Sequence, residues 1–159
     1  MKKIALIMGS DSDLSVCQKA IDFLNDFEIP YECKIISAHR TPELVREFAT
    51  KAFFNQIGVI IAAAGCAAHL AGAIASYTTL PVIALPINSS CLNGLDSLLS
   101  SIQMPKGVPV ACVSIDGAQN AAILAVQILG INDELITQKL IDLKIKDAKK
   151  ILDKNLNFN

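Results

Sequence analysis

The feature that most constrains the fold is a series of short, mostly apolar segments that alternate with helical patterns. These segments occupy residues 3–8, 31–36, 59–64, 81–85 and 108–115. Strands that carry apolar side chains on both faces are typical of parallel sheets with a layer of helices on each side. The sequence therefore predicts one α/β domain, built as a three-layer, doubly wound parallel sheet of the flavodoxin-like or Rossmann-like kind.

Helical patterns fill the intervals between these segments. Helices are predicted at 13–27, 42–55, 67–76, 94–102 and 118–129, followed by a long last helix at 134–154. Their apolar spacing predicts inward faces made of Leu14, Cys17, Ile21, Leu24 and Phe27 in the first helix, and of Leu44, Val45, Phe48, Ala52 and Phe53 in the second. Thr41 is the predicted N-cap of the second helix, and Asn132 or Asp133 that of the last.

The charge balance argues against several kinds of partner. The net charge is −1 and no block of like charges occurs, so we expect no binding to nucleic acid or to an anionic membrane surface. Residues 57–75 are long enough to span a bilayer, but their Ala and Gly content and His69 favour a strand, a loop and a short helix. We expect a cytoplasmic protein that does not enter membranes.

Cysteine and histidine usage points to neither disulfides nor metal. The five cysteines, at positions 17, 33, 66, 91 and 112, include no CxxC pair, which favours reduced thiols that pack as small apolar residues. The two histidines lie far apart and have no clustered acids beside them, so we expect no metal site. Glycine-rich dinucleotide motifs and a Walker loop are also absent from the sequence.

Three polar or glycine-rich loops follow the first three predicted strands. They are "GSDSD" (Gly9–Asp13), "SAHR" (Ser37–Arg40) and "AGCAAH" (Ala64–His69). In doubly wound sheets, ligands bind beyond the carboxyl ends of the strands, at the point where the strand order reverses. We therefore expect the three loops to converge on one site.

The first loop suits an anionic, sugar-bearing ligand. Ser10 and Ser12, with free backbone N–H groups at a helix start, fit a phosphate or a carboxylate, and Asp13 fits a ribose diol. The alternative is simple N-capping, since serine and aspartate are favoured caps.

The second and third loops supply a fixed cation and two imidazoles. Arg40 is a forked donor that stays charged, and Ser37 lies close to it in sequence. His39 can carry a proton near neutral pH, unless it is merely a surface residue. Gly65 permits close backbone approach, and His69 faces either the site or the core. These residues alone indicate an enzyme that binds a small phosphorylated molecule and moves a proton with His39.

The chain resembles the N5-carboxyaminoimidazole ribonucleotide mutase family of purine biosynthesis. The resemblance rests on "MGSDSD", "SAHRTPE", "AAAGCAAHLAG", "LPVIALPI", "GLDSLLSSIQMPKGVPVA" and "GAQNAAILAVQIL", which cover almost the whole chain to about residue 130. It implies an isomerase that converts the N5-carbamate of aminoimidazole ribonucleotide into the C4-carboxylate, without metal, ATP or organic cofactor. It also implies a homo-octamer.

The family's residue roles are carried over by the same motifs. Ser10, Asp13 and Arg40 match nucleotide-binding positions, and Ser12 and Ser37 complete the polar pocket. The resemblance makes His39 the general acid/base, and makes His69 and Gly65 the lining of the base and carboxylate end. Cys66 and Ala71 depart from the family, which usually has glycine and often proline there; for Cys66 we expect a packing role.

The residues at the chain's end form a separate expectation. We expect residues 1–130 to form the catalytic α/β domain, and residues 131–159 to form a helix that packs on this domain or on a neighbouring subunit. The last helix has more apolar residues than one stripe on a lone domain needs, and half the chain (52%) is apolar. The apolar residues in question are Leu135, Leu140, Leu143, Ile145, Ile151 and Leu152. This pattern predicts a homo-oligomer.

Two alternative functions stay open. The first is a sister carboxylase that fixes free CO2 onto aminoimidazole ribonucleotide; that branch tends to have lysine after the loop histidine, where this chain has Arg40. The second is a non-catalytic flavin-binding or phosphoacceptor module on the same fold. Flavin-binding sites are generally lined by aromatic side chains, and this chain has two tyrosines and no tryptophan. A phosphoacceptor module needs an acid at the end of the third strand, where this chain has Ala64 and Gly65.

Overall fold

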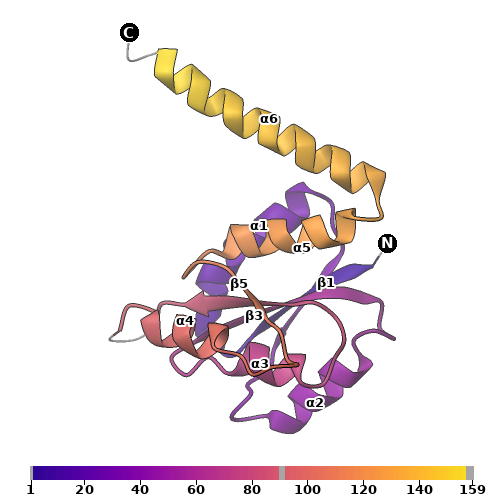
Figure 1. Cartoon of the computed structure of the whole chain (residues 1–159), viewed down its shortest axis with the longest axis vertical. Helices are drawn as coiled ribbons and strands as arrows, with labels where there is room; N and C mark the ends of the chain where they lie inside the picture. Colours follow the sequence, from indigo (N-terminus) through magenta and orange to yellow (C-terminus); the bar gives the residue numbers. More distant parts are fainter. Residues whose placement is uncertain (1, 90–91, 157–159) are drawn as a thin grey trace.

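A five-stranded parallel sheet forms the centre of the molecule (Figure 1). The computed structural model describes residues 2–89 and 92–156. The strands are β1 (Lys3–Met8), β2 (Tyr31–Ile35), β3 (Ile57–Gly65), β4 (Val82–Ile87) and β5 (Ala111–Cys112), in the order β2-β1-β3-β4-β5. This is the doubly wound arrangement predicted from the sequence, and its strand order reverses between β1 and β3.

Helices cover both faces of the sheet. They are α1 (Leu14–Asp26), α2 (Pro42–Lys51), α3 (Leu70–Ala75), α4 (Leu95–Ile102), α5 (Ala118–Gly130) and α6 (Glu134–Leu156), and a 3-10 turn, η1 (Asp11–Asp13), precedes α1. Helices α1 and α5 pack on one face and α2 and α3 on the other, while α4 lies against β4 and β5. The three-layer architecture is thereby confirmed.

The central strands are buried from both sides, as the apolar runs predicted. In β1, Ile4 and Leu6 join the core under α1 and α5, whereas Ala5 and Ile7 join the core under α2 and α3. All four are fully buried. Because successive side chains of a strand point to opposite faces of the sheet, β1 contributes residues to both cores.

The fifth strand is much shorter than predicted. Residues 108–115 were expected to form the strand, but the described ladder with β4 contains Ala111 and Cys112, after which the Val113 N–H still donates to the Ala84 carbonyl at 3.3 Å. Pro109 lies just before the paired residues, and proline cannot donate a ladder hydrogen bond. β5 is the edge strand of the sheet that the described residues form, and an edge strand tolerates such shortening.

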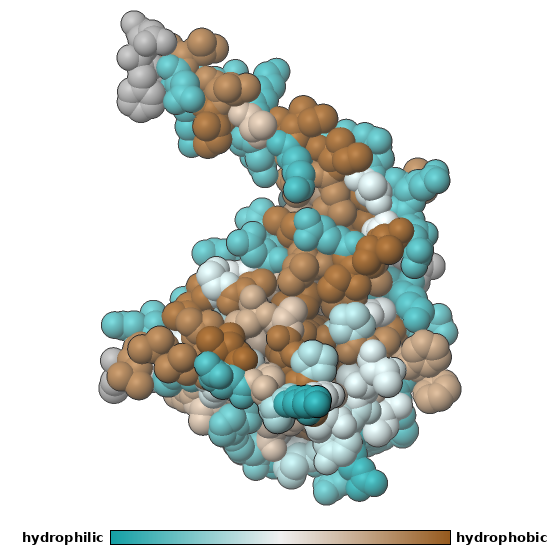
Figure 2. Space-filling model, in the orientation of Figure 1, coloured by the Kyte–Doolittle hydropathy of each residue, from teal (hydrophilic) through white to brown (hydrophobic). Residues whose placement is uncertain are grey.

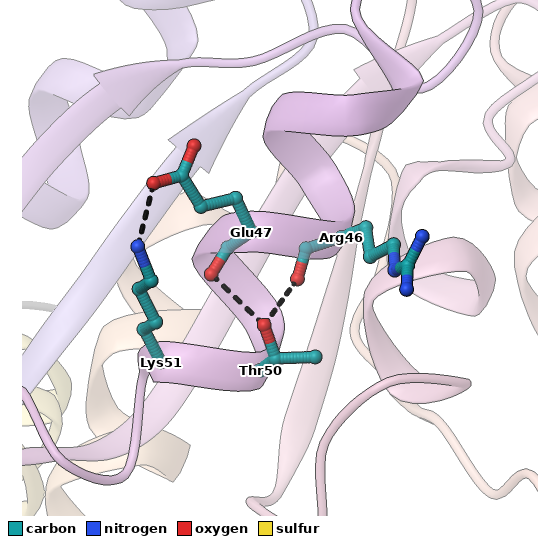
Figure 3. Close-up of polar contacts among 4 residues, drawn as sticks. All are labelled: Arg46, Glu47, Thr50 and Lys51. Atoms are coloured by element: carbon teal, nitrogen blue, oxygen red, sulfur yellow. Dashed lines mark hydrogen bonds and ion pairs between the residues drawn. The ribbon is translucent and has the colours of Figure 1, made fainter.

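Helix α2 ends earlier than predicted, and the predicted inward orientation is confirmed for Val45, Phe48 and Ala52, which are buried. It stops at Lys51 instead of residue 55, and Leu44 and Phe53 are 49% and 52% exposed, so their expected inward orientation is wrong. The outer face of the last turn is polar (Figure 3): the Thr50 hydroxyl donates to the Arg46 carbonyl at 2.8 Å, and Lys51 pairs with Glu47 at 2.8 Å. In α1, Leu14 is likewise 45% exposed, because it sits at the helix start beside the site loops.

Helix α6 is anchored only near its start. Asp133 caps it, accepting from the backbone N–H groups of Leu135 and Ile136, and Ile136 is buried in the core. Lys139 donates to the Phe27 carbonyl at 2.9 Å. Further along, the helix extends away from the body (Figures 1 and 2). Its exposed apolar residues include Leu135, Ile145, Ile151 and Leu152.

Among residues 2–89 and 92–156, no helix is long and apolar enough to cross a membrane.

Phe48 in α2 and Phe53 just beyond its end test which residues of this segment face the core. Phe48 is 7% exposed and Phe53 is 52% exposed, so truncation to alanine should affect them unequally. Phe48→Ala should lower the free energy of unfolding by about 3–5 kcal/mol. Phe53→Ala should lower it by about 1 kcal/mol, in proportion to its partial burial. Urea unfolding measures both values, and equal losses would contradict the structure.

Candidate active site

A pocket of about 470 Å³ opens beyond the carboxyl ends of β1, β2 and β3. Gly9, Ser10, Ser12, Asp13, Ser37, Ala38, His39, Arg40, Ala64, Gly65, Cys66, Ala67, His69, Leu70 and Ser89 line it. Every residue predicted for the site is in this set. The expected convergence of the three loops is therefore observed, at the switch point of the sheet.

The first loop is a closed hydrogen-bonded turn. Ser10 is the N-cap of η1, and the Asp13 carboxylate accepts from the Ser10 backbone N–H at 3.0 Å, forming a capping box. Asp13 is 3% exposed. Burial raises the pKa of the Asp13 carboxyl, against hydrogen bonds from Ser10, Ser12 and Gly9 and the charge of Arg40. Asp13 therefore both completes the capping box and lines the pocket.

The second loop holds its arginine in place. Arg40 donates through Nη2 to the Gly9 carbonyl at 2.9 Å and through Nε to the Ser37 hydroxyl at 3.3 Å. Thr41 precedes α2 as predicted, but its hydroxyl accepts from Ser37 N–H and donates to the Ser37 carbonyl, each at 3.0 Å. It therefore braces the loop and does not cap the helix with its side chain. Arg40 joins the first two loops and brings its positive charge to the pocket.

Two neighbouring positions of the third loop, Gly65 and Cys66, have a geometry that favours glycine. A Cβ at Gly65 would overlap the Ser89 hydroxyl, so only glycine fits there. Cys66 has φ +53°, a left-handed conformation that glycine adopts more easily than other residues. The Cys66 side chain is exposed and lies 3.5 Å from Ser89 Oγ, so the expected packing role is wrong: the thiol faces the pocket.

The two histidines meet inside the pocket. His39 Nε2 lies 2.9 Å from His69 Nδ1, and the rings make an edge contact with centroids 5.0 Å apart. One of the two nitrogens must donate and the other must accept. His69 is the N-cap residue of α3 and faces the site, which answers the alternative left open by the sequence.

The other cysteines vary in their surroundings. Cys17 packs in the core as expected, and burial raises the pKa of its thiol to about 12. Cys33 is exposed and Cys112 is partly exposed, so the packing expectation does not extend to Cys33. Cys91 lies outside the described residues. Within residues 2–89 and 92–156, no group of three or more His, Cys, Asp or Glu side chains could hold a metal ion.

Sequence reasoning missed Ser89 as a pocket residue. It follows β4, two residues beyond Ile87, and its hydroxyl fills the space above Gly65. The available signal was the polar "NSS" after the fourth apolar segment. That signal was weak, because a polar residue after a strand is the ordinary composition of a loop.

The family described as AIR carboxylase matches residues 3–150, which is most of the chain. The chain belongs to the AIR carboxylase family. It is also similar in structure to Treponema denticola PurE, with a TM-score of 0.88 and 30% identity, over 97% of this chain and 96% of that chain.

Two curated relatives represent the two chemistries considered from the sequence. N5-carboxyaminoimidazole ribonucleotide mutase of Pyrococcus abyssi is 59% identical over 140 residues, which cover 88% of this chain and 80% of that protein. Phosphoribosylaminoimidazole carboxylase of Saccharomyces cerevisiae is 49% identical over 151 residues, which cover 95% of this chain but 26% of that protein. The resemblance noted in the sequence is confirmed at the level of the family.

The buried Asp13 carboxylate should reduce folding stability at neutral pH. Because its pKa is raised in the folded state, its contribution to stability is complete below the unfolded pKa and is lost as pH rises through the folded pKa. Asp13→Asn keeps an oxygen acceptor without charge, so its melting temperature at pH 7 should exceed that of the parent. The gain should disappear near pH 3. Asp11→Asn, on the exposed side of the same turn, is the control; an equally stable or less stable Asp13→Asn at pH 7 would contradict this account.

Proposed function

We propose that this chain is an N5-carboxyaminoimidazole ribonucleotide mutase of purine biosynthesis. The observation that carries the proposal is the single pocket in which an arginine, a hydroxyl-rich turn and a histidine pair meet. The similarity to the mutase of Pyrococcus abyssi supports the reaction. Such a reaction is a rearrangement within one substrate, and the proposed site has no need of a cofactor.

The nucleotide would lie across the first two loops. In this proposal, Arg40 and the hydroxyls of Ser10, Ser12 and Ser37 hold the phosphate, which charge-assisted hydrogen bonds favour. Asp13 faces the ribose and also keeps the first loop closed through Ser10. The base and its carboxylate then point toward the third loop, where Gly65 and His69 line the pocket.

The chemistry needs one mobile proton and a confined CO2. As the N–C bond of the carbamate breaks, the exocyclic nitrogen takes a proton from His39 and CO2 is released. The ring carbon C4 attacks this CO2, forming the new C–C bond. His39 then takes the proton from C4, and the C–H electron pair restores the aromatic ring. No proton is gained or lost overall, and no atom is oxidised.

Confinement of CO2 is the main catalytic task of the pocket wall. Holding the released CO2 beside C4 makes recapture effectively unimolecular, an advantage that reaches several kcal/mol. The pocket lining includes Gly65, Cys66 and Ala67, which are small residues of the loop that leads to His69. Cys66 thus gives this wall a thiol where the family usually has no side chain.

The competing activity is carboxylation by free CO2. The yeast relative carries the carboxylase name, and the family's description does too. A flavin module is less well supported, because no Phe, Tyr or Trp is among the described residues that line the pocket.

Offering both nucleotides to the purified protein distinguishes the two reactions. The mutase should convert the N5-carbamate to the C4-carboxylate at a rate that does not depend on bicarbonate. The carboxylase would act on aminoimidazole ribonucleotide, at a rate that rises with bicarbonate. Turnover of aminoimidazole ribonucleotide alone, with none of the carbamate, would overturn the proposal.

His39 should be needed for turnover and not for binding. His39→Asn keeps a similar size and hydrogen-bonding capacity but loses the exchangeable ring proton. Turnover should fall by about 10²–10⁴-fold. Affinity for the product nucleotide, measured by isothermal titration, should change little because the phosphate and ribose are bound elsewhere. Near-normal turnover would make His39 a structural loop residue.

We also propose that the chain works in the cytoplasm as a homo-oligomer, an octamer by family resemblance. Two apolar faces support assembly: the outer part of α6, and a stripe on and before α4 (Figure 2). The α4 stripe consists of Leu92, Leu95, Leu99 and Ile102, which are 42–59% exposed. In this proposal, the C-terminal segment 131–159, of which the structure describes residues 131–156, packs on the chain's own domain near Ile136 and on a neighbouring subunit further along.

Truncation after Leu143 tests the role of the helix in assembly. It keeps Ile136, Leu140 and Leu143, which pack on the chain's own core, and removes the exposed apolar residues that follow. Light scattering should show the full-length protein as an oligomer at micromolar concentration and the truncated protein as a smaller species. A monomeric full-length protein would contradict the proposal.

A further inference from the structure

Helix α4 contacts the third loop of the site from outside the pocket. The backbone N–H of Ala68 donates to Ser100 Oγ at 3.0 Å. Ala68 is 2% exposed, so water does not readily satisfy this N–H. Neighbouring Ser101 is also buried, but its hydroxyl donates to the Ser97 carbonyl at 2.7 Å and lies 3.5 Å from the Ala68 carbonyl. The bond to Ser100 is therefore the close contact between α4 and Ala68.

The Ser100 hydroxyl is oriented for this task. Its own hydrogen points back along α4, where the Asp96 and Ser97 carbonyls lie 2.7 Å and 3.2 Å from the Ser100 oxygen. This leaves the lone pairs of the oxygen for the Ala68 N–H, since a hydroxyl has one hydrogen and two acceptor sites. On the same helix, the Ser97 hydroxyl donates to the Ile87 carbonyl of β4 at 2.9 Å and does not contact Ala68.

Ala68 immediately precedes His69, the residue that meets His39. The backbone N–H of His69 donates to the Ala67 carbonyl at 2.9 Å, so the peptide at Ala68 lies inside a tight turn. Any shift of this turn would move the His69 ring. The contact of 2.9 Å between His69 Nδ1 and His39 Nε2 has little tolerance for such a shift, because hydrogen bonds weaken steeply with distance and angle.

We infer that Ser100 is a positioning residue for the reaction. By holding the Ala68 N–H, it keeps the His69 ring against His39 and so fixes which nitrogen of His39 carries the proton. Which ring nitrogen of a histidine carries the proton is set by the hydrogen bond that the other ring nitrogen makes. This inference rests on the proposed function for its kinetic consequence, but its structural part concerns the histidine pair alone.

Ser100→Ala should lower kcat by about 10-fold, and by no more than about 100-fold, with KM nearly unchanged. The reason is that the nucleotide contacts lie on other loops, while the proton-transfer geometry is disturbed. Ser100→Thr should restore most of kcat, because a threonine hydroxyl makes the same bond to the preceding turn of a helix. Ser100→Cys keeps the size but offers a weakly accepting sulfur, so it should show the loss seen with alanine.

Ser97→Ala is the matched control on the same helix. It removes a fully buried hydroxyl that contacts the Ile87 and Gly94 carbonyls instead of Ala68. It should lower the melting temperature at least as much as Ser100→Ala and keep kcat within about 2-fold, as expected for a hydroxyl outside the proton-transfer geometry. Equal losses of kcat in both variants would show a general effect of helix stability and overturn the inference.

A readout independent of turnover uses the chain's two histidines. In protein labelled with ¹⁵N-histidine, the ring signals can be assigned with His39→Asn and His69→Asn. Ser100→Ala should change the ring signals of both histidines, and Ser97→Ala should leave them in place. Unchanged ring signals in Ser100→Ala would overturn the inference. If the protein does not convert the carbamate, the proposed function fails, whereas the ring signals still test the role of Ser100.

Discussion

The site depends above all on the pairing of β1 with β3. In this register Met8 lies opposite Ala63, and the chain continues the pairing one residue further, where the Gly9 N–H donates to the Ala63 carbonyl at 2.9 Å. The first and third loops therefore leave the sheet side by side. On the other side of β1, the pairing of Met8 with Ile35 brings in the loop that carries His39 and Arg40. A change of one residue in either register would separate groups that now share one pocket.

The two cores explain why this register is stable. Alternate residues of β1 and β3 enter opposite cores, so a slip by one position would exchange large and small side chains on both faces. Small residues also matter on the helices. Ala118, Ala121, Ala122 and Ala125 of α5 are fully buried, which lets this helix approach the sheet and α1 closely. A chain with 5% aromatic residues can fill its interior in this way.

The sequence predicted the parts of the structure that depend on local pattern. Strand β1 and the start of α6 agree with the predicted residues, and the three loops converge because parallel strands end at one edge. The failures have tertiary causes. Leu44 fits an apolar stripe as well as Val45 does, and only packing against the sheet decides which one is buried.

The site residues show the same distinction between features visible in the local sequence and features that arise only on folding. The loop residues were found because their chemistry is visible in the sequence, while the contact between His39 and His69 joins residues thirty positions apart. Ser89 and Ser100 carry no distinctive motif and reach the third loop from β4 and α4 only in the folded chain. Cys66 lines the pocket and has a positive φ, and composition and periodicity reveal neither feature.

The bond between Arg40 and the Gly9 carbonyl bears on the thermodynamics of ligand capture. A free arginine side chain loses up to about 2 kcal/mol of rotamer entropy when a ligand immobilises it. Here much of that ordering takes place when the protein folds, since the guanidinium already bridges two loops. A bound anion would therefore meet a cation that is largely in place, and more of its interaction energy would appear as affinity. The same bridge couples the two loops, so that ordering one of them orders the other.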